Sequence, residues 1–187
     1  MGDERSRAAV PGDDKDWTWV LERQCPECGV DPGSIDPATV PDLVRANAAG
    51  WERVLARADA RDRPRPDVWS PLEYGCHVRD VFALFDARLA LMLDEDDPLF
   101  ANWDQDETAV AERYDLQDPA TVAAELAAAA DHVAASFASV AGDQWDRVGR
   151  RSDGARFTVR TFAQYFVHDP VHHLWDVGGP TGEEHGP

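Results

Sequence analysis

Four long segments with apolar residues at helical spacing constrain the fold of this 187-residue chain more than any other feature. The second and third segments begin at Ser70-Pro71 and Asp118-Pro119, a capping residue followed by a first-turn proline. Four helices of this length predict an all-α four-helix bundle. The predicted helices cover residues 41–60, 70–93, 118–141 and 158–178.

The connection between the second and third helices predicts how the helices run. Residues 94–118 form a link of 25 residues, which is too long for a simple antiparallel hairpin. A helix of about 23 residues is roughly 34 Å long, whereas an extended link of this size spans up to about 80 Å. The second and third helices can therefore run parallel. The predicted topology is up-down-down-up, with the second and fourth helices antiparallel.

Local signals refine the outline of the chain. Pro170 falls inside the fourth helix and predicts a kink near Phe166. A small hairpin is expected within residues 147–157. Polar tails at both ends are expected to be disordered, which leaves one bundle domain. The expected parts are a tail at residues 1–16, a domain at residues 17–177 and a tail at residues 178–187.

Charge and apolar patterning exclude several classes of protein. The formal net charge of −18 opposes binding to nucleic acid, and ten acids against one arginine lie in residues 94–118. Because the sequence has no apolar run of the length needed for a membrane span or a signal peptide, a cytoplasmic location is expected. The chain has only three cysteines, and this small, odd number does not fit a secreted disulfide framework.

Three histidines predict a metal site. His168 and His172 are four residues apart, so their rings share one face of the fourth helix. His77 on the second helix comes level with them if the two helices are antiparallel, and three imidazoles can then bind one divalent ion. His173 lies roughly 100° around the helix and is not expected to join them. The alternative is a set of core or surface histidines with no ligand role.

The cysteines form a second local motif. Cys25-Pro26-Glu27-Cys28-Gly29 is half of a zinc-ribbon site, but the second cysteine pair is missing. A structural turn with free thiols, a redox dithiol and a second metal site completed by other residues all remain open. Cys76 is expected to pack in the core.

Three stretches carry a resemblance to a known family. They are residues 69–80 (WSPLEYGCHVRD), 102–106 (NWDQD) and 168–175 (HDPVHHLW). Together they resemble the DinB-like metalloenzyme superfamily, and most of all its mycothiol-dependent maleylpyruvate isomerase type, over roughly residues 40–177.

The resemblance implies a four-helix bundle of the topology above and a divalent metal held by His77, His168 and His172. It also implies transfer or isomerisation that uses a low-molecular-weight thiol. Three imidazoles leave a coordination position open, where a thiol could be activated or a carbonyl polarised. Zinc is the first choice of metal, although imidazole also suits nickel, iron and copper.

The expected function is therefore a thiol-dependent transferase or isomerase acting on an electrophilic small molecule. The alternative is a non-catalytic metal-binding or stress-related interaction protein on the same fold. A homodimer through an exposed helix face is a further expectation.

Carboxylates near the predicted site are candidates for supporting roles. Glu73, Asp169 and Asp176 could orient the ligating rings. Asp104 and Asp106 could reach the site from the link as a ligand, a base or a substrate contact. The alternative for all five is a solvated acidic residue.

Overall fold

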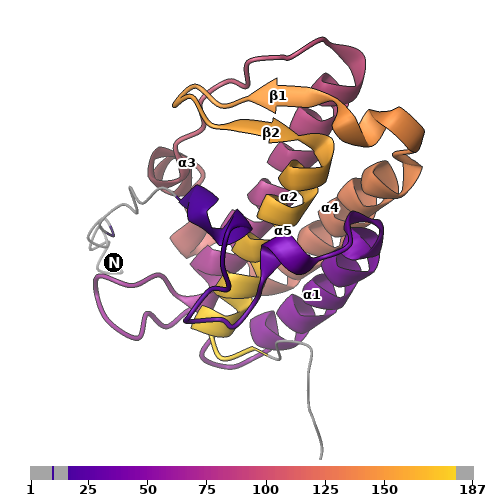
Figure 1. Cartoon of the computed structure of the whole chain (residues 1–187). Coiled ribbons are helices and arrows are strands. Elements are labelled where there is room, and N and C mark those ends of the chain that lie inside the picture. The colour runs from indigo at the N-terminus through magenta and orange to yellow at the C-terminus, as the bar shows by residue number, and fades with distance from the viewer. Residues whose placement is uncertain (1–9, 11–16, 180–187) are drawn as a thin grey trace, which may run out of the picture.

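The computed structural model describes residue 10 and residues 17–179, and its core is a bundle of four long helices (Figure 1). This confirms the predicted all-α four-helix bundle, and the small hairpin is also present. The helices are α1 (Val40–Leu55), α2 (Pro71–Asp94), α3 (Gln105–Ala111), α4 (Pro119–Ser139) and α5 (Val159–Asp176). Strands β1 (Val148–Arg150) and β2 (Arg156–Thr158) pair antiparallel. Short 3-10 turns are η1 (Trp17–Leu21), η2 (Pro32–Ser34), η3 (Pro37–Thr39), η4 (Tyr114–Leu116) and η5 (Gly142–Asp146).

The predicted tails, residues 1–16 and 178–187, lie outside the described residues apart from residues 10, 178 and 179. Within the described part of the chain, no helix is long and apolar enough to cross a membrane.

Side-chain caps fix where the long helices begin. Ser70 and Glu73 form a reciprocal capping box at the start of α2. Asp118 and Thr158 likewise accept a backbone N–H three residues on, at the starts of α4 and α5.

The first helix is shorter than predicted and ends at Leu55. Turns follow the helix, and in them the carbonyl of Ala60 accepts a hydrogen bond from the backbone N–H of Leu72, with an N-to-O distance of 2.7 Å. Leu72 lies in the first turn of α2, where backbone N–H groups have no partner within the helix.

Contacts between α2 and α5 show that these helices are antiparallel. His77 near the start of α2 meets His173 near the end of α5, with ring centroids 4.9 Å apart. Phe85, further along α2, stacks on Phe162 near the start of α5. The predicted relation between the second and fourth helices is confirmed.

Contacts of α1 give the remaining directions. The side chain of Asn47 donates to the carbonyl of Pro170, and Arg57 just after α1 donates to the carbonyl of Val177, so α1 and α5 are parallel. Ion pairs join Arg45 to Asp131 and Arg61 to Asp118, so α1 and α4 are antiparallel. The order is therefore up-down-down-up, as predicted.

Pro170 lies inside α5, which continues across it as one helix. The ring removes a backbone N–H that would otherwise bond to the carbonyl of Phe166. The bond from Asn47 to the Pro170 carbonyl, 2.8 Å long, ties this part of α5 to α1. The kink predicted near Phe166 stays a prediction.

The long link between α2 and α4 is anchored to the bundle at several points. The backbone N of Phe100 donates to the carbonyl of Arg150, which joins the link to the hairpin. Asp104 caps α3 by accepting two backbone N–H groups. The buried Tyr114 donates its hydroxyl to Asp80 on α2. These anchors hold the link, and Trp103 within it, against one side of α2.

The segment before α1, residues 17–39, packs on α5 (Figure 1). Val20 is fully buried there. The amide of Gln164 on α5 donates to the carbonyls of Gly33 and Ile35, at 3.1 and 2.9 Å. One side of α5 therefore faces this segment, and another faces α2.

A buried ion pair supports the start of α2 and gives a stability prediction. Arg63 donates to both oxygens of Glu73, and the two side chains are only 13% and 3% exposed. Removing one partner of a buried pair typically costs about 3–5 kcal/mol. Glu73→Ala should lower the free energy of unfolding by this amount in a denaturant titration. Asp67→Ala breaks an exposed pair with Arg65 and should cost less than about 1 kcal/mol.

The same pair should make stability depend on pH. Burial raises the pKa of Glu73, but the bonds from Arg63 and Ser70 outweigh it and hold the pKa below its ordinary value of 4.5. A lowered pKa contributes stability that is present above pH 4.5 and is lost as the pH falls further. The difference in stability between the native protein and Glu73→Ala should therefore shrink in acid. A difference that stays constant down to pH 3 would contradict this origin.

Candidate metal centres

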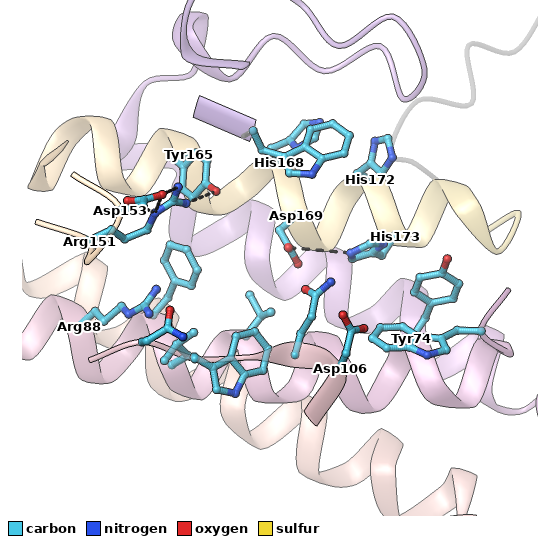
Figure 2. A pocket seen from close by; sticks show the side chains of 18 of the residues that line it. Tyr74, Arg88, Asp106, Arg151, Asp153, Tyr165, His168, Asp169, His172 and His173 are labelled. Carbon is cyan, nitrogen blue, oxygen red and sulfur yellow. Dashed lines mark hydrogen bonds and ion pairs between the residues drawn. The ribbon is translucent and has the colours of Figure 1, made fainter. Parts of the chain in front are cut away.

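Three side chains from α2 and α5 form the first candidate metal centre, which we call the inner cluster: His77, Asp169 and His173. One ligand atom of each residue lies within 4.8 Å of the others. His77 Nε2 is 3.5 Å from Asp169 Oδ1. His173 Nε2 is 3.9 Å from Asp169 Oδ2, and Figure 2 shows these two side chains facing each other. Both contacts are longer than a normal hydrogen bond. The space between the atoms suits an ion better than a direct bond.

Buried polar atoms without partners support this interpretation. His77 is 1% exposed, and among the described residues neither of its ring nitrogens has a hydrogen-bond partner. Asp169 Oδ1 is also buried and unpartnered there. Because nearly all buried polar atoms in proteins are satisfied, these need an explanation, and a bound cation supplies one. Two imidazoles and one carboxylate fit zinc or ferrous iron.

The charge state of Asp169 also favours a cation. Burial raises the pKa of this carboxyl, but the nearby His77 and His173 outweigh burial and lower the pKa to about 2. The group is therefore a carboxylate at neutral pH. Asp176 Oδ2 lies 2.9 Å from His173 Nδ1, an arrangement that orients a ligating ring.

Four other side chains form a second candidate centre, which we call the cysteine cluster: Cys25, Cys28, His168 and His172. One ligand atom of each lies within 4.8 Å of the others. The cysteines come from the turn after η1, and the histidines lie on successive turns of α5. Figure 2 shows His168 and His172 on one side of α5 and Asp169 and His173 on the other.

The chemistry of Cys28 bears on the redox alternative. Burial, with the neighbouring Cys25 thiol, raises the pKa of Cys28 to about 11. Reactive redox cysteines have a lowered pKa, so the raised pKa of Cys28 does not favour a redox dithiol.

The third cysteine, Cys76, is buried in the core as predicted, and burial raises its pKa to about 12.

The structure divides the three predicted ligands, because His77 lies in the inner cluster and His168 and His172 lie in the cysteine cluster. It does not bring the three ligand atoms into one group. Successive helical residues are about 100° apart, so the face of α5 that meets α2 carries residues 169 and 173 rather than 168 and 172. His173 lies apart from that histidine pair, but it groups with His77, which was not expected from the sequence.

Sequence reasoning did not identify Asp169 and His173 as candidate ligands. The available signal was an Asp-x3-His pair, which overlaps the His-x3-His pair with an offset of one residue. Both pairs have the spacing that two ligands on one helix need. From the sequence, Asp169 is assigned only the role of orienting a ring.

A cavity of about 490 Å³ lies beside both clusters. Trp17, Trp69 and Trp103 line it together with Asp169 and His173. Trp103 stacks on the ring of His77 with a centroid distance of 5.6 Å, and Trp69 contacts the same ring. The indoles of Trp69 and Trp103 therefore form an apolar wall beside the inner cluster.

The other end of the cavity carries positive charge. Figure 2 shows Arg88 and Arg151 near Tyr165, away from His173. Arg151 is bonded to Asp153 and Tyr165, whereas Arg88 donates to the carbonyl of Ala101 and has no carboxylate partner among the described residues. Burial and then the neighbouring Arg151 lower the pKa of Arg88. An anionic group would be favoured here.

The remaining candidate carboxylates have separate roles. Asp106 is half-buried and lines the cavity, while Asp104 is exposed and caps α3. Glu73 is bonded to Arg63 and Ser70, at the capping box of α2.

Fold and site together define a four-helix-bundle protein with candidate metal centres on its last helix. The model of the DinB superfamily matches residues 42–177, and the chain belongs to this superfamily.

A solved structure, YfiT from Bacillus subtilis, is similar with a TM-score of 0.67 and 17% sequence identity. The match covers 77% of this chain and 86% of that one. YfiT is described as a probable metal-dependent hydrolase with an unusual four-helix bundle topology. The comparison with curated proteins finds no match.

Proposed function

We propose that this protein is a metal-dependent enzyme that acts with a low-molecular-weight thiol on an electrophilic small molecule that carries a carboxylate. The enzyme either transfers the thiol to that molecule or isomerises the molecule. The observation that carries the proposal is the inner cluster, whose ligands His77, Asp169 and His173 lie beside a cavity. Three protein ligands leave a coordination position for a reactant. A divalent ion held there would lower the pKa of a bound thiol or polarise a carbonyl.

Residues of the cavity support substrate binding. The indoles of Trp17, Trp69 and Trp103 offer apolar contact and limit competing water. Asp106 lines the cavity and is our candidate for a base or a substrate contact. Arg88 offers a charged donor to a carboxylate at the opposite end from His173.

Arg88→Gln tests the assignment of an anionic substrate. A hydrogen bond to a charged group contributes about 1.5–3 kcal/mol, so KM for a carboxylate-bearing electrophile should rise roughly 10- to 100-fold. KM for a neutral electrophile such as monobromobimane should be unchanged, and so should the metal content. Equal changes for both electrophiles would contradict the assigned role of Arg88.

Thiol conjugation is the direct test of the function. The zinc-loaded protein would be mixed with monobromobimane and either mycothiol, glutathione or cysteine, and the fluorescent thioether measured. In this reaction the thiolate sulfur forms a bond to the bimane carbon, bromide leaves, and the thiol proton passes to solvent. Turnover above the uncatalysed rate is expected for one thiol. His77→Ala should abolish it, and His132→Ala, an exposed histidine on α4, should not.

Hydrolysis is a second candidate function, supported by the described activity of the YfiT protein. The same open coordination position could activate water instead of a thiol. Hydrolysis of p-nitrophenyl acetate without thiol, lost in His77→Ala, would favour this candidate and contradict the first. Metal binding without either activity would favour the non-catalytic alternative.

A further inference from the structure

We propose that Cys25, Cys28, His168 and His172 hold a second, structural zinc ion that fastens the segment before α1 onto α5. This site is separate from the proposed catalytic centre and does not depend on its function. Two thiolates and two imidazoles are a common ligand set for structural zinc, which is tetrahedral and closed to substrate.

The cysteine turn has the backbone that such a site needs. The N–H of Gly29 donates to the carbonyl of Cys25 at 3.0 Å, and the N–H of Cys25 donates to the carbonyl of Val30 at 2.8 Å. Gly29 has φ of +75°, a left-handed conformation that favours glycine. This tight turn brings both sulfurs to the same side, toward α5.

The histidines complete the set from α5. His168 and His172 are 4% and 7% exposed, and His168 Nε2 has no hydrogen-bond partner among the described residues. His172 Nδ1 faces Cys25 Sγ at 3.7 Å. These nitrogens and sulfurs converge without forming a strong hydrogen bond with one another, and a common ion satisfies them.

Glu27, the residue between the two cysteines, supports the same assignment. Its Oε2 lies 3.2 Å from His172 Nε2, on the opposite edge of the ring from the nitrogen that faces Cys25. A ligating histidine typically gives its second N–H to a carboxylate, which fixes the ring orientation. The Cys-Pro-Glu-Cys turn therefore supplies both ligands and the group that orients a third.

The ion would also organise the cavity. Trp17, at the start of the fastened segment, packs on His168 and His172 with ring centroids 5.2 and 5.3 Å away, and it lines the cavity. Asp169 and His173 of the inner cluster alternate with this pair on the same helix. Holding residues 168 and 172 toward the cysteine turn therefore fixes the rotation of α5 that turns residues 169 and 173 toward α2.

Cobalt substitution tests the site without relying on activity. Full-length protein without a polyhistidine tag would be stripped of metal under reducing conditions and titrated with Co²⁺. A thiolate-to-cobalt charge-transfer band should appear and saturate by two equivalents per chain in the native protein, because both clusters take up the ion, and at one equivalent in His77→Ala. The band should be absent in Cys25→Ser/Cys28→Ser and should persist in His77→Ala, which alters only the inner cluster.

Matched controls and a conservative variant show whether loss of the band is specific to the cysteine cluster. Cys76→Ala and His132→Ala remove a cysteine and a histidine outside both clusters and should retain the band. If the double serine variant does not fold, Cys28→His keeps four ligands and should show roughly half the charge-transfer intensity. No band in the native protein, or an equal band in either cysteine variant, would overturn the proposal. A native band without thiol-dependent turnover would reject the proposed function and leave this inference standing.

Discussion

Changing His173 to alanine should lower metal-dependent turnover at least about 100-fold, whereas changing its neighbour His172 should lower it less than roughly 10-fold. His173 is one of the three candidate ligands in the inner cluster, and losing even a residue that only orients a metal ligand typically costs 10- to 100-fold. His172 lies in the cysteine cluster and leaves the inner ligands in place. The measurement is kcat/KM for thiol conjugation in both variants, with metal content determined in parallel.

His132→Ala is the control for this pair, because it removes an exposed histidine on α4. His173→Ala should keep the cobalt–thiolate band of the cysteine cluster, and His172→Ala should weaken it. Equal losses of turnover and of the band in both variants would indicate one shared ion and contradict the division into two clusters.

Removing the structural ion should lower thermal stability strongly. At a free zinc concentration about 1,000-fold above Kd, a site present only in the folded state contributes about 4 kcal/mol. For a chain of this size, that corresponds to roughly 8–16 °C in Tm. In a His77→Ala background, which isolates the cysteine cluster, a chelator should lower Tm by this amount in differential scanning calorimetry.

Adding Cys25→Ser and Cys28→Ser to His77→Ala gives the matched comparison. This triple variant should already have the lower Tm, and the chelator should shift it by less than about 2 °C. A large chelator effect in the triple variant would place the stabilising ion elsewhere. No chelator effect in His77→Ala would mean that the cysteine cluster holds no stabilising ion.

The helical pattern predicted most of the fold because each long helix buries a repeating apolar stripe. The capping signals at Ser70 and Asp118 placed two helix starts to within a residue. The length of the link was enough to predict the parallel pair and hence the up-down-down-up order. The end of the first helix was missed, because the turns after Leu55 depend on a bond between Ala60 and Leu72 that no local pattern indicates.

The candidate sites were harder to predict because they depend on the rotation of α5. Spacing alone favours His168 with His172 and Asp169 with His173 equally. A rotation of about 100°, equivalent to one residue, decides which pair meets His77. That rotation comes from packing between helices, which the sequence of α5 does not contain.

The role of the cysteines was open for a related reason. Cys25 and His172 are 147 residues apart, yet their side chains are in contact. The sequence shows half of a ligand set at each end of the domain and gives no sign that the halves meet. Only the packing of the segment before α1 on α5 brings them together.

Metal content of the native chain tests the central claim most directly. Protein purified without a tag or chelator would be analysed by native mass spectrometry and elemental analysis. Two divalent ions per chain are predicted, with one remaining in His77→Ala, one remaining in Cys25→Ser/Cys28→Ser, and none when these changes are combined. A single ion per chain that is lost on changing any one of His77, His168 or His172 would contradict the account.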